Sequence, residues 1–254
     1  MSGQIELRGH RIWSYRYENK GEPVVILHGG LSYSEKILPY LLPVYADSME
    51  VFAYDRSGHG RSAYRDGAFD MNFQRDELIS YLEDVVRGPA HLVGHSDGAN
   101  CAVMAALARH DLVKSVVAIG PSLHPRDAVI DFPTNPQPRD EDQIEHDSLS
   151  PDSPDMFLRK LRECFEMWAR DPQIELSDLA ALRMPVLFMQ GDDDVVTNAT
   201  AESYAKAVGD GRLAIIAGAS HDVIKEKTSL VQAALLDFYA NLNYPETKYP
   251  NWRN

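Results

Sequence analysis

Residues 90–98 read Ala-His-Leu-Val-Gly-His-Ser-Asp-Gly, an apolar run that passes directly into a serine between two glycines. Gly94, Ser96 and Gly98 match the pattern G-x-S-x-G, which gains meaning only between a strand and a helix. That context is predicted here, because an alanine-rich helix to about His110 follows the apolar run. The flanking glycines avoid clashes that a Cβ would create in so tight a turn. The segment predicts an exposed nucleophile at a helix N-terminus, with an ordinary glycine turn as the alternative.

Further apolar runs lie on both sides of this segment, and most of them end at glycine or polar residues. Unbroken apolar runs are typical of strands that are buried on both faces, as in parallel sheets. The alternation of such strands with helices predicts an α/β fold, with a mostly parallel central sheet and helices on both faces. The predicted elements are a hairpin over residues 4–17, strands at 23–27, 49–54, 90–94, 113–120, 185–190 and 212–217, and helices over 72–86, 199–208 and 228–242.

Residues 121–184 break this alternation, because they contain no convincing strand. Their first half is rich in Pro and Asp, and Ser153-Pro154 then makes a favourable helix start. We interpret 121–184 as an inserted helical cap over the carboxyl ends of the strands, where open parallel sheets bind ligands. The core domain is then 1–120 together with 185–254. An apolar stripe follows the helix start; we expect it to pack within the cap, with substrate contact as the alternative, and it comprises Phe157, Leu161, Phe165 and Trp168.

A serine hydroxyl is a weak nucleophile until a base removes its proton. His221 follows the last predicted strand in Gly-Ala-Ser-His, where the loop can return to the strand ends, so it is the candidate base. His28, His59 and His95 adjoin glycine turns, and we interpret them as packing the loops. A carboxylate must then orient the imidazole. The run Asp192-Asp193-Asp194 after the fifth buried strand supplies candidates, although a run of charges is often only a solvated turn.

Five stretches in this order resemble the α/β-hydrolase superfamily across nearly the whole chain. They are His28-Gly29-Gly30, residues 55–62 (Asp-Arg-Ser-Gly-His-Gly-Arg-Ser), residues 94–98, residues 191–194 and His221.

The resemblance implies the α/β-hydrolase fold with an inserted helical cap and a catalytic triad in the chain order Ser, Asp, His. It favours Asp194 as the acid, because in that family the acid lies three residues beyond the glycine that ends this strand. It also implies two backbone N–H donors for the oxyanion. One belongs to Asp97, and the other to Gly30, with Leu31 as the second candidate.

The side chain of Asp97 has two interpretations. A carboxylate in the first turn of a helix is favoured by the helix dipole, so it is expected to point away into a salt bridge or a helix cap. Alternatively, it binds a cationic group of the substrate or repels anions. Some α/β-hydrolases with Ser-Asp-Gly at this turn resemble hydrolases of amino-acid esters.

These features predict a serine hydrolase that cleaves a small carboxylic ester, thioester, amide or aminoacyl ester through an acyl-enzyme on Ser96. The alternatives are a cofactor-free haloperoxidase, a C–C bond hydrolase or a lyase with the same triad, and a non-catalytic ligand-binding protein on this fold. We expect no cofactor and no metal, because the sequence has neither H-E-x-x-H nor a paired cysteine motif.

Charge and composition limit the partners. The formal net charge of −13 argues against nucleic acid and anionic membranes, so a small-molecule substrate is the expected partner. Cys101 and Cys164 are interpreted as reduced thiols. The N-terminus has no apolar signal region, and no run reaches the length of a membrane helix, which favours a cytoplasmic protein. Both a monomer and a homodimer fit these data.

Overall fold

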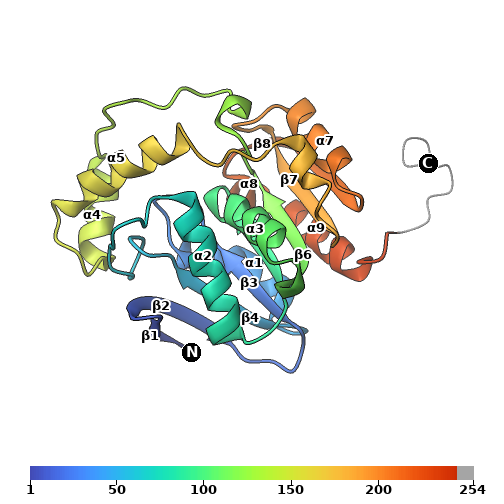
Figure 1. Ribbon diagram of the computed structural model, residues 1–254, viewed down its shortest axis with the longest axis horizontal. Helices are drawn as coiled ribbons and strands as arrows, with labels where there is room; N and C mark the ends of the chain where they lie inside the picture. The colour runs from blue at the N-terminus through green and yellow to red at the C-terminus, as the bar shows by residue number, and fades with distance from the viewer. Residues whose placement is uncertain (245–254) are drawn as a thin grey trace.

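The computed structural model describes residues 1–244, in which one eight-stranded sheet runs in the order β1-β2-β4-β3-β5-β6-β7-β8 (Figure 1). The first two strands form a hairpin, and β2 pairs antiparallel with β4, whereas all other neighbours are parallel. This confirms the predicted mostly parallel sheet. The strands are β1 Ser2–Leu7, β2 His10–Tyr17, β3 Pro23–Leu27, β4 Glu50–Asp55, β5 Ala90–His95, β6 Val113–Ile119, β7 Val186–Asp193 and β8 Gly211–Ser220.

The central strands are apolar throughout because each of their faces packs against a separate core. In β3, Val25 and Leu27 point into one cluster of buried side chains, whereas Val24 and Ile26 point into the other. All four side chains are fully buried. An unbroken apolar run in the sequence is therefore the expected pattern for this strand.

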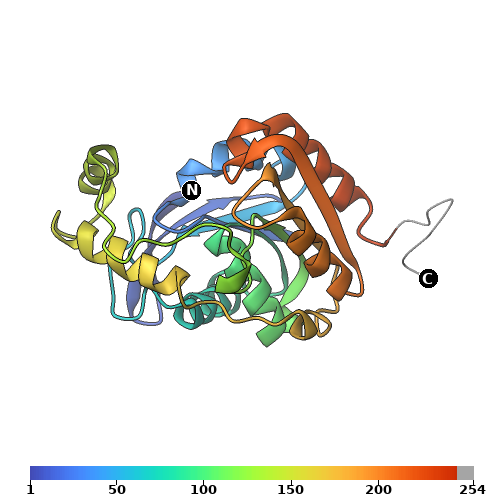
Figure 2. The ribbon, with the colours of Figure 1, turned by 90° about the horizontal axis from the view of Figure 1, so that it is seen from above.

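Helices cover both faces of the sheet, as Figure 2 shows from above. One face carries α1 Leu38–Tyr45, α8 Val223–Glu226 and α9 Thr228–Ala240, and the other carries α2 Met71–Tyr81, α3 Asp97–Ala108 and α7 Asn198–Ala207. The helix predicted over 72–86 ends its α-helical part at Tyr81 and continues as a π-helical turn, Leu82–Val86. The sequence analysis missed α1, which contains Pro39 and Pro43, and the one-turn helix α8.

In the described part of the chain, the segment between β6 and β7 contains helices and loops but no strand, and Ala128 forms an isolated bridge with Val196. Its helices are η4 Pro125–Asp127, α4 Asp140–Leu149, α5 Met156–Trp168 and α6 Leu176–Leu179. Helix α5 begins at Met156, so the start predicted at Ser153-Pro154 is wrong by about two residues. Helix α4 was not predicted at all; its sequence is mostly polar and buries no residue. In Figures 1 and 2, α4 and α5 lie to one side of the layered core.

Polar contacts tie this segment to loops of the core. The Asp152 carboxylate accepts a hydrogen bond from the backbone N–H of Tyr64 at 2.8 Å. On α4, Glu145 accepts one from the Tyr33 hydroxyl at 3.0 Å and pairs with Lys36 at 2.7 Å. Tyr33 and Lys36 lie in the loop after β3, and Tyr64 lies in the loop after β4, so both loops start at the carboxyl end of a strand. Helices α4 and α5 are therefore held above the edge of the sheet where the site residues gather. Among the described helices, none combines the length and apolar character needed to cross a membrane.

Candidate active site

Ser96 occupies a strained turn between β5 and α3. Its backbone has φ 55° and ψ −121°, a region that non-glycine residues rarely adopt. A Cβ on Gly94 would collide with the backbone of Gly98, and a Cβ on Gly98 would collide with the carbonyl of Leu27. Glycine is therefore required on both sides of the serine. This packing fixes the sharp turn that was predicted from the sequence.

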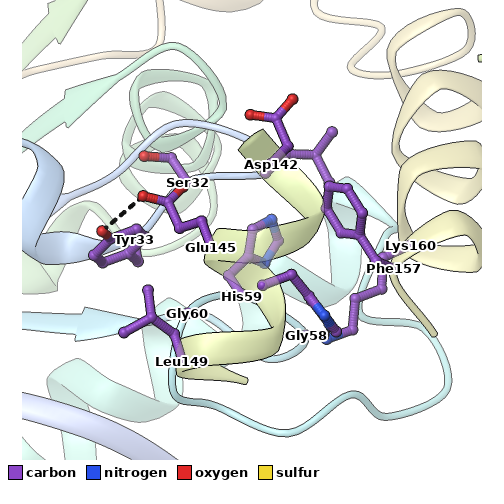
Figure 3. Close-up of a pocket in the computed structure, with 12 residues that line it drawn as sticks. Ser32, Tyr33, Gly58, His59, Gly60, Asp142, Glu145, Leu149, Phe157 and Lys160 are labelled. Atoms are coloured by element: carbon purple, nitrogen blue, oxygen red, sulfur yellow. Dashed lines mark hydrogen bonds between the residues drawn. The ribbon is translucent and has the colours of Figure 1, made fainter. Parts of the chain in front are cut away.

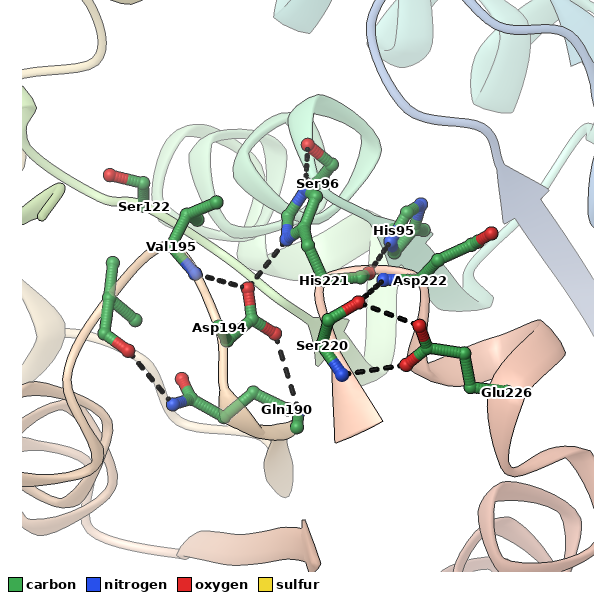
Figure 4. Close-up of polar contacts among 12 residues, drawn as sticks. His95, Ser96, Ser122, Gln190, Asp194, Val195, Ser220, His221, Asp222 and Glu226 are labelled. Carbon is green, nitrogen blue, oxygen red and sulfur yellow. Dashed lines mark hydrogen bonds and ion pairs between the residues drawn. The ribbon is translucent and has the colours of Figure 1, made fainter. Parts of the chain in front are cut away.

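Three loops at the carboxyl ends of β5, β7 and β8 bring Ser96, Asp194 and His221 into one hydrogen-bonded row (Figure 4). The Ser96 Oγ lies 2.9 Å from Nε2 of His221. The Nδ1 atom of His221 lies 2.6 Å from Oδ1 of Asp194. Because a neutral imidazole has one donor and one acceptor nitrogen, a proton on Nδ1 leaves Nε2 able to accept the serine proton.

The carboxylate of Asp194 is buried and held by further donors. Burial raises its pKa, but the hydrogen bond and charge of His221, together with the N–H groups of Val195 and Gly191, hold the pKa below its usual value. Asp194 therefore stays ionised and can stabilise a protonated imidazole.

The other two members of the acidic run lie elsewhere. Asp192 is exposed and accepts hydrogen bonds from the backbone N–H groups of Gly218 and Ala219, at 2.7 and 3.2 Å. Asp193 is exposed as well. The structure thus brings Asp194, and neither of its two neighbours, to His221.

Two side chains, those of His95 and Glu226, hold the loop that carries the imidazole of His221. His95 Nε2 lies 2.8 Å from the carbonyl oxygen of His221. Burial and the neighbouring His221 lower the pKa of His95 to about 4, so it stays neutral and can hold this carbonyl. On the other side, Glu226 accepts hydrogen bonds from the N–H and hydroxyl of Ser220. His95 thus supports the loop, as interpreted from the sequence, whereas the role of Glu226 was not foreseen.

Gly120, at the end of β6, gives the imidazole its space. Its φ is +59°, and a Cβ there would lie 3.0 Å from the ring of His221 and 3.4 Å from the carboxylate of Asp194. Gly120 was predicted from the sequence only as the end of a strand. A glycine that follows an apolar run, at the level of the nucleophile turn, is the signal that could have identified it.

The candidate oxyanion donors lie beside the serine. Gly30 packs against the carboxylate of Asp97, and the preceding Gly29 lies beside Ser96, since a Cβ on Gly29 would be 3.3 Å from the Ser96 Cβ. Leu31 adopts a positive φ of 48°. Gly30 and Leu31 therefore both remain candidates for the second donor, and Gly30 is the one that packs directly against Asp97.

The side chain of Asp97 points toward the inserted segment. It is only 2% exposed, and its two oxygens accept hydrogen bonds from Nε1 of Trp168 at 2.8 and 3.0 Å. Within residues 1–244 it forms no salt bridge and no helix cap, so that expectation was wrong. Burial raises its pKa, while the charges of Arg56 and His221 and the Trp168 N–H act in the opposite direction.

A pocket of about 140 Å³ opens over Ser96. Its walls come from the core loops, from residues 120–132 and from the end of α5. The lining residues are Ser96, Asp97, Asn100, Gly120, Ser122, Ala128, Ile130, Phe132, Trp168, Asp171, Val195 and His221.

Of the apolar stripe on α5, only Trp168 lines this pocket. Phe165 packs against the Trp168 ring, with 4.8 Å between ring centroids. Phe157 lines a separate pocket of about 50 Å³ together with His59 (Figure 3), and Leu161 is buried. Most of the stripe thus packs the segment, which was the preferred interpretation.

The apolar wall formed by Ala128, Ile130 and Phe132 was not predicted from the sequence. These residues lie in a Pro- and Asp-rich stretch without helical or strand periodicity, so no pattern marked them. Tertiary contacts place them, because the N–H of Val129 donates to the carbonyl of Val195 at 2.8 Å. Within the described residues, no group of three potential metal ligands occurs.

Comparison with known proteins places the chain in a hydrolase family. A family model described as alpha/beta hydrolase family matches residues 24–231. The chain is 36% identical over 104 residues to 2-(acetamidomethylene)succinate hydrolase of Mesorhizobium japonicum, covering 41% of this chain and 37% of the relative. It is 26% identical over 266 residues to a non-heme haloperoxidase of Rhodococcus erythropolis, covering 88% and 94%.

The likeness extends to solved structures. A serine hydrolase involved in carbazole degradation superposes with a TM-score of 0.77 at 21% identity, covering 94% of this chain and 98% of that one. At this identity the likeness shows the fold alone. The matches to the first curated relatives span less than half the length of those proteins.

Proposed function

Because this chain belongs to the alpha/beta hydrolase family, we propose that it cleaves a small carboxylic ester, thioester or amide through an acyl-enzyme on Ser96. The observation that carries the proposal is the row of hydrogen bonds from Ser96 through His221 to Asp194, at 2.9 and 2.6 Å. Its order along the chain and its place at the strand ends match the chemistry of a triad.

In the proposed reaction, the Ser96 oxygen attacks the carbonyl carbon while Nε2 of His221 takes the serine proton. Negative charge then develops on the carbonyl oxygen, where the N–H groups of Gly30 and Asp97 are the proposed donors. His221 passes its proton to the leaving alcohol, thiol or amine. A water molecule, deprotonated by the same nitrogen, attacks the acyl-enzyme and regenerates the serine.

The charges of the pocket favour a neutral or cationic substrate. None of its twelve lining residues is Lys or Arg, whereas Asp97 and Asp171 contribute carboxylates. The Asp171 carboxylate pairs with Arg170 at 2.8 Å, so the argument rests on Asp97. A dicarboxylic substrate, such as the succinate derivative in the name of the Mesorhizobium relative, would meet repulsion here. A buried carboxylate without an ionic partner is costly, so a cation on the substrate would compensate Asp97. Aminoacyl esters are the corresponding substrate class.

The charge preference is tested with Asp97→Asn. We expect this change to weaken hydrolysis of aminoacyl esters selectively, while matched neutral esters are affected little. An equal effect on both ester classes would remove Asp97 from substrate selection, without affecting the proposed reaction.

The reaction itself is tested with short p-nitrophenyl esters and their thioester counterparts. Ser96→Ala should lower turnover by roughly 10⁶-fold, because the nucleophile is lost. Ser122→Ala is the matched control, since Ser122 lines the same pocket but lies outside the row. Hydrolysis that survives in Ser96→Ala, or falls equally in both variants, would contradict the acyl-enzyme.

A haloperoxidase reaction is the second candidate, because the Rhodococcus relative matches almost the full length of both chains. In that reaction hydrogen peroxide replaces water at the acyl-enzyme and releases a peracid, which oxidises a halide. Bromination of a phenolic dye in acetate and peroxide, lost in Ser96→Ala, would detect it. C–C bond hydrolysis and lyase activity use the same triad and should be included in the screen.

A further inference from the structure

Arg56 is buried beneath the loop that carries the candidate oxyanion donor. Its side chain is fully buried, and within residues 1–244 it has no carboxylate partner at ion-pair distance. One guanidinium nitrogen, Nη2, donates to the carbonyl oxygens of His28 and Gly29, at 2.9 and 2.7 Å. The other, Nη1, donates to the Gln74 side chain and contacts the Cys101 sulfur at 3.8 Å. A buried arginine that binds two consecutive carbonyls holds a loop in one orientation.

His28 reinforces the same contact. Its Nε2 lies 3.0 Å from the backbone N–H of Arg56 and must therefore accept that hydrogen bond. Burial lowers the pKa of His28 well below its usual value, so the ring is neutral and its proton lies on Nδ1. Nδ1 is 2.7 Å from the Gly29 oxygen. The Gly29 carbonyl thus accepts hydrogen bonds from two buried donors.

The orientation of this carbonyl determines the direction of the next N–H. In a trans peptide, the C=O of Gly29 and the N–H of Gly30 point in opposite directions. With the carbonyl held toward Arg56, the Gly30 N–H is directed away from the buried interior. In the part of the chain that the structure describes, neither this N–H nor that of Asp97 donates to a protein acceptor.

We propose that Arg56 is a positioning residue of the oxyanion hole: its guanidinium fixes the Gly29–Gly30 peptide so that the Gly30 N–H is free for the substrate oxygen. The inference rests on the proposed function. The positive charge of Arg56 acts in the same sense, because a buried cation behind the donors favours negative charge on the substrate. The charge of Arg56 acts on the site, because burial raises the pKa of Asp97 and the nearby Arg56 charge lowers it.

Kinetics of Arg56→Lys and Arg56→Gln test the proposal. Both changes lose the paired hydrogen bonds to the loop, and we expect kcat to fall by roughly 10–10²-fold, less than for complete loss of an oxyanion donor. KM should change little, because the interaction strengthens only in the transition state. Arg56→Lys should retain more activity than Arg56→Gln, since it keeps the charge.

The chain offers a matched control in Arg212. Its guanidinium also donates to two consecutive carbonyls, those of Asn241 and Leu242, but at the end of α9 and away from the pocket. Arg212→Lys and Arg212→Gln should lower thermal stability and leave kcat unchanged. Equal losses of kcat at both arginines, or a loss confined to KM, would overturn the proposal.

A crystal structure of the wild type with a phosphonate on Ser96 tests the geometry without any substitution. The phosphonyl oxygen should accept hydrogen bonds from the N–H groups of Gly30 and Asp97, while the Gly29 carbonyl remains on Arg56. An oxygen bound instead by the Leu31 N–H, or a reversed Gly29–Gly30 peptide, would overturn the inference. If the wild type reacts with neither ester nor phosphonate, the proposed function is contradicted. The inference about Arg56 is then tested separately, by comparing the orientation of the Gly29–Gly30 peptide in crystals of the unreacted wild type and of unreacted Arg56→Lys.

Discussion

The core loops and the segment between β6 and β7 line the same pocket, but they are built by different means. The core side holds its residues through close contacts: a Cβ on Gly94 or Gly98 would collide with backbone atoms, and one on Gly120 would press on the His221 ring. The other side holds Trp168 and Phe132 through ring packing and a hydrogen bond to Asp97. From this difference we propose that the core determines the reaction, whereas the segment acts with Asp97 to determine which molecules reach it.

After loss of the nucleophile itself, the largest expected effect is on the core side, at Asp194. Asp194→Asn removes the acceptor that fixes the imidazole tautomer, so we expect kcat for ester hydrolysis to fall by roughly 10⁴-fold. Asp192→Asn is the control, because Asp192 is exposed and binds only backbone N–H groups. Similar losses in both variants would mean that the acidic run acts through its charge rather than through one placed carboxylate.

Gly120→Ala tests whether the core side tolerates displacement of the His221 imidazole. The added Cβ would lie 3.0 Å from the His221 ring, and the alanine would have to adopt the positive φ of this position. Because misplacement of a catalytic group by about 1 Å can cost on the order of 10²-fold, we expect a kcat loss of that size. Gly88→Ala is the control, since a Cβ there meets nothing within 4 Å. An unchanged kcat in Gly120→Ala would break the distinction between the two sides.

On the other side of the pocket, Trp168→Phe keeps an aromatic ring and removes the N–H that binds Asp97. A hydrogen bond to a charged group contributes about 1.5–3 kcal/mol, so we expect a loss of stability of about this size in denaturant titrations. KM should rise while kcat changes little. Trp13→Phe is the control, because the Trp13 side-chain N–H is buried and has no hydrogen-bond partner within residues 1–244. A loss of kcat like that of Gly120→Ala would show that this side also determines the reaction.

The smallest effect concerns the pH dependence of stability at Asp97. Burial raises its pKa above 3.8, so the folded state binds the proton more readily than the unfolded state. The contribution of Asp97 to stability therefore falls as pH rises through the range just above 3.8 and stays unfavourable at higher pH.

Asp97→Asn should accordingly gain stability relative to the wild type as the pH is raised from about 4 to about 7, in urea titrations. Asp193→Asn, at an exposed position, should show no such trend. If the stability gain of Asp97→Asn becomes smaller as the pH rises, the pKa of Asp97 in the folded protein is lowered rather than raised.

The same two regions differ in how far the sequence predicted them. The central strands were predicted because burial on both faces leaves an unbroken apolar run. Ser96 and His221 were predicted because glycines and strand ends mark their loops, whereas the choice of Asp194 among three aspartates rested on the family resemblance. Helix α4 and the wall at Ile130 and Phe132 were missed, since polar or irregular stretches carry no periodicity and are placed by tertiary contacts. The partner of the Asp97 carboxylate was also missed, because Trp168 is distant in sequence and belongs to a stripe that mostly packs inward.

The account depends on Ser96 being the nucleophile in a working triad. The most direct test treats the wild-type protein with a fluorophosphonate probe and locates the adduct by peptide mass spectrometry. We predict a single adduct on the peptide that contains Ser96, which is lost in His221→Ala and retained in Ser122→Ala. No adduct, or an adduct on another residue, would contradict the account.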